Sequence, residues 1–80
     1  MNNWKYLILD NGDISYGIAF APYIQHKDQA EQAKSAGFTV IGAGFLRLYA
    51  DHANVHVECY GYSDSLDIKS QPGDVDYFKL

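Results

Sequence analysis

The chain has 80 residues, of which 48% are hydrophobic and 15% aromatic, and it carries a formal net charge of −4 at pH 7. This length allows a single domain, residues 1–80, with a small core, and the aromatic content argues against a disordered protein. The negative charge argues against direct binding of nucleic acid, whose phosphates would repel the chain.

Two segments at the start of the chain, residues 4–9 and 14–20, are rich in strand-forming side chains and predict a β-hairpin. Between them, Asn11-Gly12 supplies two residues that tolerate positive φ, a strong hairpin signal. The returning segment alternates large apolar residues with small ones. One face of it is therefore expected to be buried, which fixes the register of the pair.

A helix is predicted over residues 23–36, after Ala21-Pro22 ends the strand. Proline is tolerated at a helix start because its missing N–H is one of the groups left unpaired there. The apolar positions of this segment are mostly alanines, which would let the helix lie close against a sheet. Gly37 is placed to end the helix in the left-handed conformation.

The third predicted strand spans residues 38–49 and contains Gly42-Ala43-Gly44. Glycine inside a strand indicates a β-bulge or a close backbone approach. A bulge is the preferred interpretation here, because a phosphate-binding loop needs further glycines opening a helix.

The fourth predicted strand follows a turn at residues 51–54, and it places two sets of side chains on opposite faces. Residues 63–70 fit either a short helix or a strand, and both alternatives stay open. After a turn at Pro72-Gly73, residues 75–78 predict a short last strand. The expected fold is α+β: an antiparallel sheet of four to five strands with one helix on one face, in the order β-β-α-β-β-β. The order of the strands in the sheet is not predicted.

Cys59 is the only cysteine, so an intrachain disulfide and a thiolate metal cluster are excluded. His52 and His56 are four residues apart, but they are expected in a turn and a strand and not on one helix face, so no metal site is predicted. We expect no cofactor. The absence of an apolar run near the ~18–20 residues of a membrane span, and of a signal peptide pattern, predicts a cytoplasmic protein with no membrane contact.

The whole net charge lies in residues 51–80, which hold six acidic and two basic residues, whereas residues 1–50 hold four of each. This asymmetry predicts a protein partner with a basic surface. The carboxylates proposed to imitate nucleic-acid phosphates are Asp64, Asp67, Asp74 and Asp76. The aromatic side chains proposed as anchors are Tyr60, Tyr62 and Tyr77.

Several short stretches resemble the Janus-type phosphohistidine phosphatases. Residues 4–9 (W-K-Y-L-I-L) are similar to that family's first strand, which has an aromatic-Lys-Tyr-aliphatic run. Residues 42–44 (G-A-G), 55–57 (V-H-V) and 60–63 (Y-G-Y-S) resemble its glycine triplet and the following I-H-V-Y-G-Y-S strand, with two extra residues here. The likeness covers about half of the chain.

This resemblance implies an alternative function, a phosphohistidine phosphatase or phosphate-binding domain that uses Lys5, His26, Arg47 and Ser63. The family binds phosphate through a first-strand lysine, arginines and the serine after Y-G-Y, and uses a histidine near the helix start as general acid/base. Lys5 and Ser63 match such positions. His26 lies two residues beyond the family's histidine and Arg47 two beyond its arginine, where this chain has Phe45. The family's second long helix has no counterpart, and most of the cations that hold its dianionic substrate are absent, which favours a related sheet without the activity.

In size, charge and lack of a catalytic set, the chain resembles small phage-encoded inhibitors of bacterial defence, anti-CRISPR proteins among them. The leading hypothesis is therefore an inhibitor, acting in the host cell, that blocks a basic nucleic-acid-binding surface by phosphate mimicry and catalyses no reaction. A third alternative is a structural or assembly subunit. Either a monomer or a homodimer is compatible with the sequence.

Overall fold

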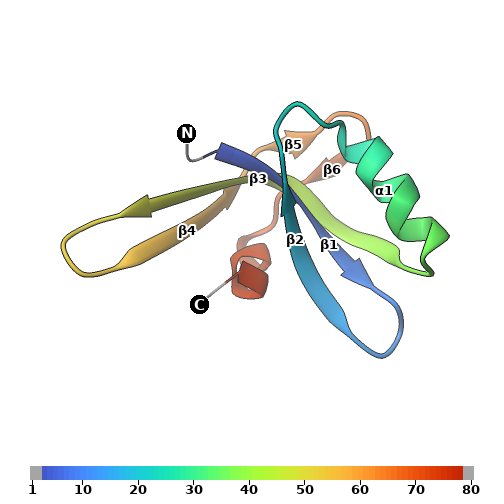
Figure 1. Ribbon diagram of the computed structural model, residues 1–80, viewed down its shortest axis with the longest axis horizontal. Coiled ribbons are helices and arrows are strands. Elements are labelled where there is room, and N and C mark those ends of the chain that lie inside the picture. Colours follow the sequence, from blue (N-terminus) through green and yellow to red (C-terminus); the bar gives the residue numbers. More distant parts are fainter. Residues whose placement is uncertain (1–2, 79–80) are drawn as a thin grey trace.

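The computed structural model describes residues 3–78 (Figure 1). Its elements in chain order are β1 Asn3–Asp10, β2 Ser15–Phe20, α1 His26–Ser35, β3 Thr39–Ala50, β4 Val55–Tyr60, β5 Tyr62–Ser63, β6 Ile68–Lys69 and the 3-10 helix η1 Pro72–Phe78. The main antiparallel sheet has the order β2-β1-β3-β4, and β5 and β6 form a second, two-stranded sheet. The predicted α+β class, with an antiparallel sheet and one α-helix on one of its faces, is confirmed.

The predicted first hairpin is present, but its turn differs from the expected one. Gly12 has a φ of +96°, whereas Asn11 does not adopt positive φ. Instead, Oδ1 of Asn11 accepts hydrogen bonds from the N–H groups of Asp13 and Ile14, both at 2.9 Å. The asparagine side chain therefore takes the place of a backbone acceptor, as it commonly does in turns.

Helix α1 begins at His26, three residues later than predicted. It buries Ala30 and Ala33 against the side chains that β1, β2 and β3 turn toward it. Gly37 ends the helix as predicted, with a φ of +91°. The N–H of Phe38 then donates to the carbonyl of Ala33 at 3.0 Å, which completes the cap.

Strand β3 contains the predicted irregularity. Between Ile8 and Leu9 of β1, the paired position on β3 moves from Gly42 to Val40, so Ile41 is the extra residue of a β-bulge. The neighbouring glycines allow close packing as well. A Cβ atom on Gly42 would lie 2.9 Å from the Ile8 side chain, so a larger residue there would have to displace that side chain.

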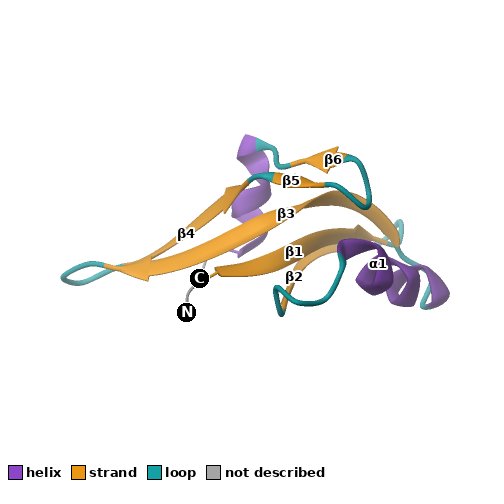
Figure 2. Ribbon diagram, turned by 90° about the horizontal axis from the view of Figure 1, so that it is seen from above, coloured by secondary structure: helices purple, strands orange, loops and turns teal. Residues whose placement is uncertain are grey.

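The two faces of the sheet are covered by different segments (Figure 2). Helix α1 packs on one face, together with the side chains of Leu66 and Ile68 from the β5–β6 hairpin. Helix η1 packs on the other face, where Phe78 contacts the cluster formed by Tyr6, Ile8 and Leu46. None of the helices within residues 3–78 has the length and apolar character needed to cross a membrane.

The prediction of a strand over residues 75–78 is wrong, because this segment belongs to η1. The side chain of Asp74 explains the difference. Its carboxylate accepts the N–H of Gln71 at 3.1 Å, while its own N–H donates to the Gln71 carbonyl at 3.0 Å. These two bonds close a helical turn that begins at Pro72. Residues 63–70, for which a short helix and a strand were both predicted as possible, form most of the β5–β6 hairpin.

Candidate functional site

A hollow of about 360 Å³ opens where the start of α1 meets β1, β3 and the β5–β6 hairpin. The lining residues are Lys5, Gln25, His26, Phe45, Tyr62, Asp64 and Ser65. Polar side chains from three separate segments therefore converge on one space beside the apolar ring of Phe45, and convergent polar groups of this kind are the usual mark of a ligand site.

His26, the first residue of α1, is held deep in this site. Its Nε2 lies 2.8 Å from the carbonyl oxygen of Gly44, and its ring makes edge-to-face contacts with Phe20 and Phe45. Because a carbonyl can only accept, we assign the proton to Nε2 and leave the lone pair on Nδ1. Burial lowers the pKa of His26, and the charge of Lys5 lowers it further, against an opposing effect of the Gly44 hydrogen bond. The imidazole is therefore neutral at neutral pH.

Lys5 supplies the positive charge of the hollow. Its Nζ donates to the carbonyl oxygen of Ile24 at 2.8 Å, which holds the half-buried side chain beside the segment that leads into α1. An ammonium group has three protons. The bond to Ile24 uses one of them, so the group can donate to a ligand in the hollow while it stays anchored.

The β5–β6 hairpin forms the opposite wall and caps the helix. Oγ of Ser65 accepts the N–H of Lys27 at 3.1 Å, although the two residues are 38 positions apart. Gln25, at the N-cap position itself, makes no capping bond with its side chain. Tyr62 donates its hydroxyl to the carboxylate of Asp67, and this bond is the main reason that the pKa of Tyr62 is raised. Asp64 brings a negative charge to the hollow.

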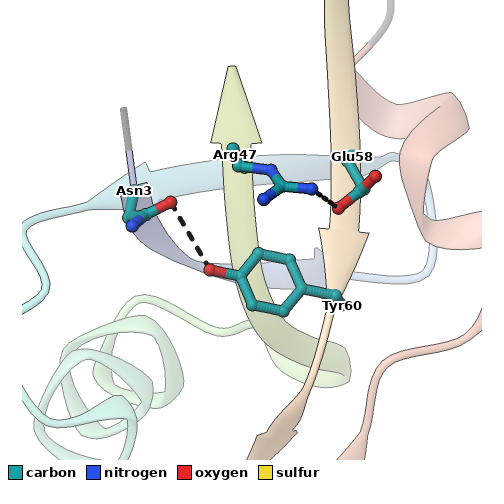
Figure 3. A network of polar contacts seen from close by, with 4 residues as sticks. All are labelled: Asn3, Arg47, Glu58 and Tyr60. Carbon is teal, nitrogen blue, oxygen red and sulfur yellow. Dashed lines mark hydrogen bonds and ion pairs between the residues drawn. The ribbon is translucent and has the colours of Figure 1, made fainter. Parts of the chain in front are cut away.

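Of the four residues predicted for a phosphate site, Lys5 and His26 line the hollow, whereas Arg47 and Ser63 do not. Arg47 lies two residues after Phe45 on β3, but its side chain points toward Glu58 of β4 and forms an ion pair with it (Figure 3). Ser63 lies in β5 with 1% of its surface exposed, and its Oγ has no hydrogen-bond partner among the described residues.

The environment of Arg47 is aromatic. Its guanidinium carbon lies 5.9 Å from the ring centre of Tyr49 and 5.7 Å from that of Tyr60. The Tyr60 ring also stacks on Phe45, which lines the hollow, and its hydroxyl reaches Oδ1 of Asn3 at 3.5 Å (Figure 3). Arg47 is thus engaged by groups of the protein itself and adds no direct contact to the hollow.

The four aspartates predicted to form one acidic surface are divided by the fold. Asp74 is 7% exposed and hydrogen-bonded in the interior, so it is not part of an exposed acidic surface. Asp64 and Asp67 lie on the β5–β6 hairpin, whose side chains pack with α1, whereas Asp76 belongs to η1 on the other face of the sheet.

The aromatic anchors predicted for the same surface are also on different elements. Tyr60 and Tyr62 lie at the end of β4 and in β5, and Tyr77 lies in η1. All three rings are partly exposed. These three rings and the four aspartates therefore do not form one continuous surface.

The sequence reasoning missed Gln25 and Phe45 as lining residues. Phe45 was considered only as a departure from the resembling family, and glutamine is not a preferred N-cap residue. Ser65 carried a weak signal, since a serine-rich segment after a strand suggests capping. The helix that it caps lies elsewhere in the chain, which no local pattern indicates.

Metal binding and thiol chemistry have little support among the described residues. Within residues 3–78, no group of three or more His, Cys, Asp or Glu side chains is placed to hold a metal ion. The thiol of Cys59 is half-buried, and burial raises its pKa to about 11. At neutral pH this thiol is protonated and is a poor nucleophile.

Comparisons with protein-family models, with curated proteins and with solved structures found no match to this chain. Its candidate function therefore rests on the hollow described above.

Proposed function

We propose that the hollow at the start of α1 binds a phosphorylated ligand and that the protein hydrolyses a phosphohistidine-type P–N bond there. The observation that carries this proposal is the meeting of Lys5 and His26 in one space. The two residues come from β1 and α1. One offers a fixed positive charge and the other a neutral, buried imidazole.

Lys5 would bind the phosphoryl oxygens. The positive end of the helix dipole favours anions as well, and α1 begins at the wall of the hollow with His26. This is a long-range contribution, because the N–H of Lys27 donates to Ser65 and that of Asp28 to the Gln25 carbonyl. Asp64 acts in the opposite direction, because its carboxylate repels a phosphate dianion. The balance of one cation and one carboxylate suits a ligand that carries a phosphoryl group next to a positively charged nitrogen.

His26 is suited to move a proton during hydrolysis. With its Nε2 proton directed to Gly44, Nδ1 can accept a proton from a water molecule as that water attacks phosphorus. The P–N bond breaks, and the proton held by His26 passes to the leaving nitrogen, which gives inorganic phosphate and free histidine. The neutral state imposed by burial keeps the imidazole ready to act as a base at neutral pH.

The experiment is the release of inorganic phosphate from a phosphohistidine peptide, followed by ³¹P NMR. His26→Ala should reduce the rate by about 10²-fold or more, the usual contribution of a general acid/base, and Lys5→Met should weaken binding of the peptide. His52→Ala is the matched control, because His52 lies in the exposed turn after β3. A rate for the wild type no greater than in buffer, or an equal rate for His26→Ala, contradicts the proposal.

The leading hypothesis from the sequence, an anti-CRISPR-like inhibitor, stays a prediction, but with a smaller binding surface than expected. The exposed β5–β6 hairpin brings Asp64, Asp67 and Tyr62 together, which gives two carboxylates and one aromatic ring for a basic partner. Reversal of Asp64 and Asp67 to lysine should abolish any salt-sensitive binding to such a partner. Unchanged binding would exclude this role for the hairpin.

A further inference from the structure

We propose that two copies of this chain pair through β4, antiparallel about a two-fold axis, with Val57 opposite Val57 of the second copy. This would join two four-stranded sheets into one sheet of about eight strands. The proposal does not depend on the proposed function, since β4 contributes no residue to the hollow at the start of α1.

The first argument is the position of β4. It is the last strand in the order β2-β1-β3-β4, so within residues 3–78 only β3 pairs with it in the sheet. The N–H of Asp51 donates to the carbonyl of Asn54 at 3.0 Å at the tip of the hairpin. Because hydrogen-bonded pairs alternate along an antiparallel ladder, the registered pairs Tyr49–His56 and Arg47–Glu58 are the bonded ones.

The same alternation directs the other backbone groups of β4 away from β3. These groups belong to Val55, Val57 and Cys59, whose N–H and C=O point to the free edge. An exposed row of this kind is a ready template for another strand. At its far end, Cys59 lines a second hollow, of about 510 Å³, together with Ser70 and Pro72.

The second argument is that β4 is complementary to itself in one register. With Val57 opposite Val57 of the second chain, Val55 lies opposite Cys59. The three residues whose backbone groups point to the free edge therefore meet the same three residues of the second chain. This alignment places His56 opposite Glu58 across the interface. Within each chain His56 is hydrogen-bonded to Asp51 and Glu58 is paired with Arg47, so the alignment brings these two pairs side by side with no like charges directly opposite. Shifts of two residues would instead place Glu58 against Glu58 or His56 against His56, which puts like groups directly opposite each other.

The third argument is the apolar surface beside this edge. A hollow of about 230 Å³ on the face that carries η1 is lined by Ala19, Leu46, Leu48, Val55, Val57 and Phe78. Val55 is 60% exposed although it belongs to this surface. In the paired arrangement, the second copy adds its own Val55, Val57 and Cys59 to the same face, and the exposed apolar surface becomes continuous with that of its partner.

The test is the dissociation constant of the dimer, measured by analytical ultracentrifugation over a range of concentrations. Val57→Pro removes an N–H that points to the free edge, so proline is tolerated there by the fold but not by the pairing. We expect it to raise the dissociation constant by about tenfold or more, the equivalent of two hydrogen bonds lost across the axis. Val57→Thr keeps the N–H and the β-branched shape, and is expected to remain dimeric.

Hydrogen exchange on the wild type keeps the proposal testable if Val57→Pro does not fold. The amides of Val55, Val57 and Cys59 should become more protected as the concentration rises, whereas the amides of the β2 edge should not. A chain that is monomeric at every concentration overturns the proposal. A dimer that persists in folded Val57→Pro, or protection that appears at β2 instead, also overturns it, because the contact then lies elsewhere.

Discussion

The hydroxyl of Tyr6, in β1, donates a hydrogen bond to the carboxylate of Asp74, which lies 68 residues further along the chain. Ser70 shares the same hydroxyl at 2.8 Å. Both Tyr6 and Asp74 are buried, on the face of the sheet opposite α1. The bond fastens η1 to the centre of the sheet, and it removes one carboxylate of the acidic C-terminal region from the surface.

Replacement of Tyr6 by phenylalanine should therefore destabilise the protein. The variant keeps the ring and its edge-to-face contact with Phe78, but the buried carboxylate of Asp74 loses its hydroxyl donor and keeps the N–H of Gln71. Such a loss costs about 1–3 kcal/mol in the free energy of unfolding, which urea denaturation would measure. Tyr49→Phe is the control, because Tyr49 is 45% exposed, and its effect should stay within about 0.5 kcal/mol. Equal effects of the two substitutions would contradict this account.

Features set by neighbouring residues could be predicted from the sequence. The first hairpin depends on Asn11 and Gly12, and the end of α1 depends on Gly37, so each is specified within a few positions. The bulge beside Gly42 was also predictable, because only a close approach or an irregular strand explains glycine there.

Features set by distant residues could not be predicted. Residues 75–78 contain strand-forming side chains, yet the bonds of Asp74 to Gln71 and Tyr6 select a 3-10 helix. The acidic surface was overestimated for the same reason, since charge counting cannot show which carboxylate is buried. The meeting of Lys5 and His26 was implied by the family resemblance alone.

The buried state of His26 predicts that the protein loses stability in mild acid. Burial lowers the pKa of this imidazole in the folded state below its usual value of 6.5, so the unfolded chain binds more protons once the pH falls below that value. The folding stability that goes with a neutral His26 is fully present above pH ~6.5, and it is lost as the pH falls toward the lower folded-state pKa. Urea denaturation between pH ~7.5 and ~5 should show this decline.

His26→Gln removes the titrating group, and its unfolding free energy should fall less over the same range. An NMR titration of the His26 side chain gives an independent measurement, in which its pKa should lie below the usual value of 6.5. A pKa of His26 at or above its usual value would contradict the account in which burial keeps this imidazole neutral.

Gly44 should be intolerant of a side chain. A Cβ atom there would lie 2.9 Å from both the Tyr6 ring and the backbone oxygen of Tyr60. Gly44→Ala must therefore displace backbone or a buried ring, at a cost of about 1–3 kcal/mol in unfolding free energy. Gly73→Ala is the matched control, because nothing lies within 4 Å of its Cβ position. Since the Gly44 carbonyl also holds His26, phosphate release should fall in Gly44→Ala even where the variant is folded.

Asp64 should weaken the binding of anions in the hollow, because its carboxylate lines the same space as Lys5. Asp64→Asn keeps the shape of the side chain and removes the negative charge, so it should tighten the binding of inorganic phosphate about threefold, an effect that salt would reduce. Asp13→Asn makes the same change of net charge in the turn between β1 and β2. It should leave the affinity unchanged in an NMR titration with phosphate. An equal gain in both variants would show that net charge, and not the hollow, governs binding.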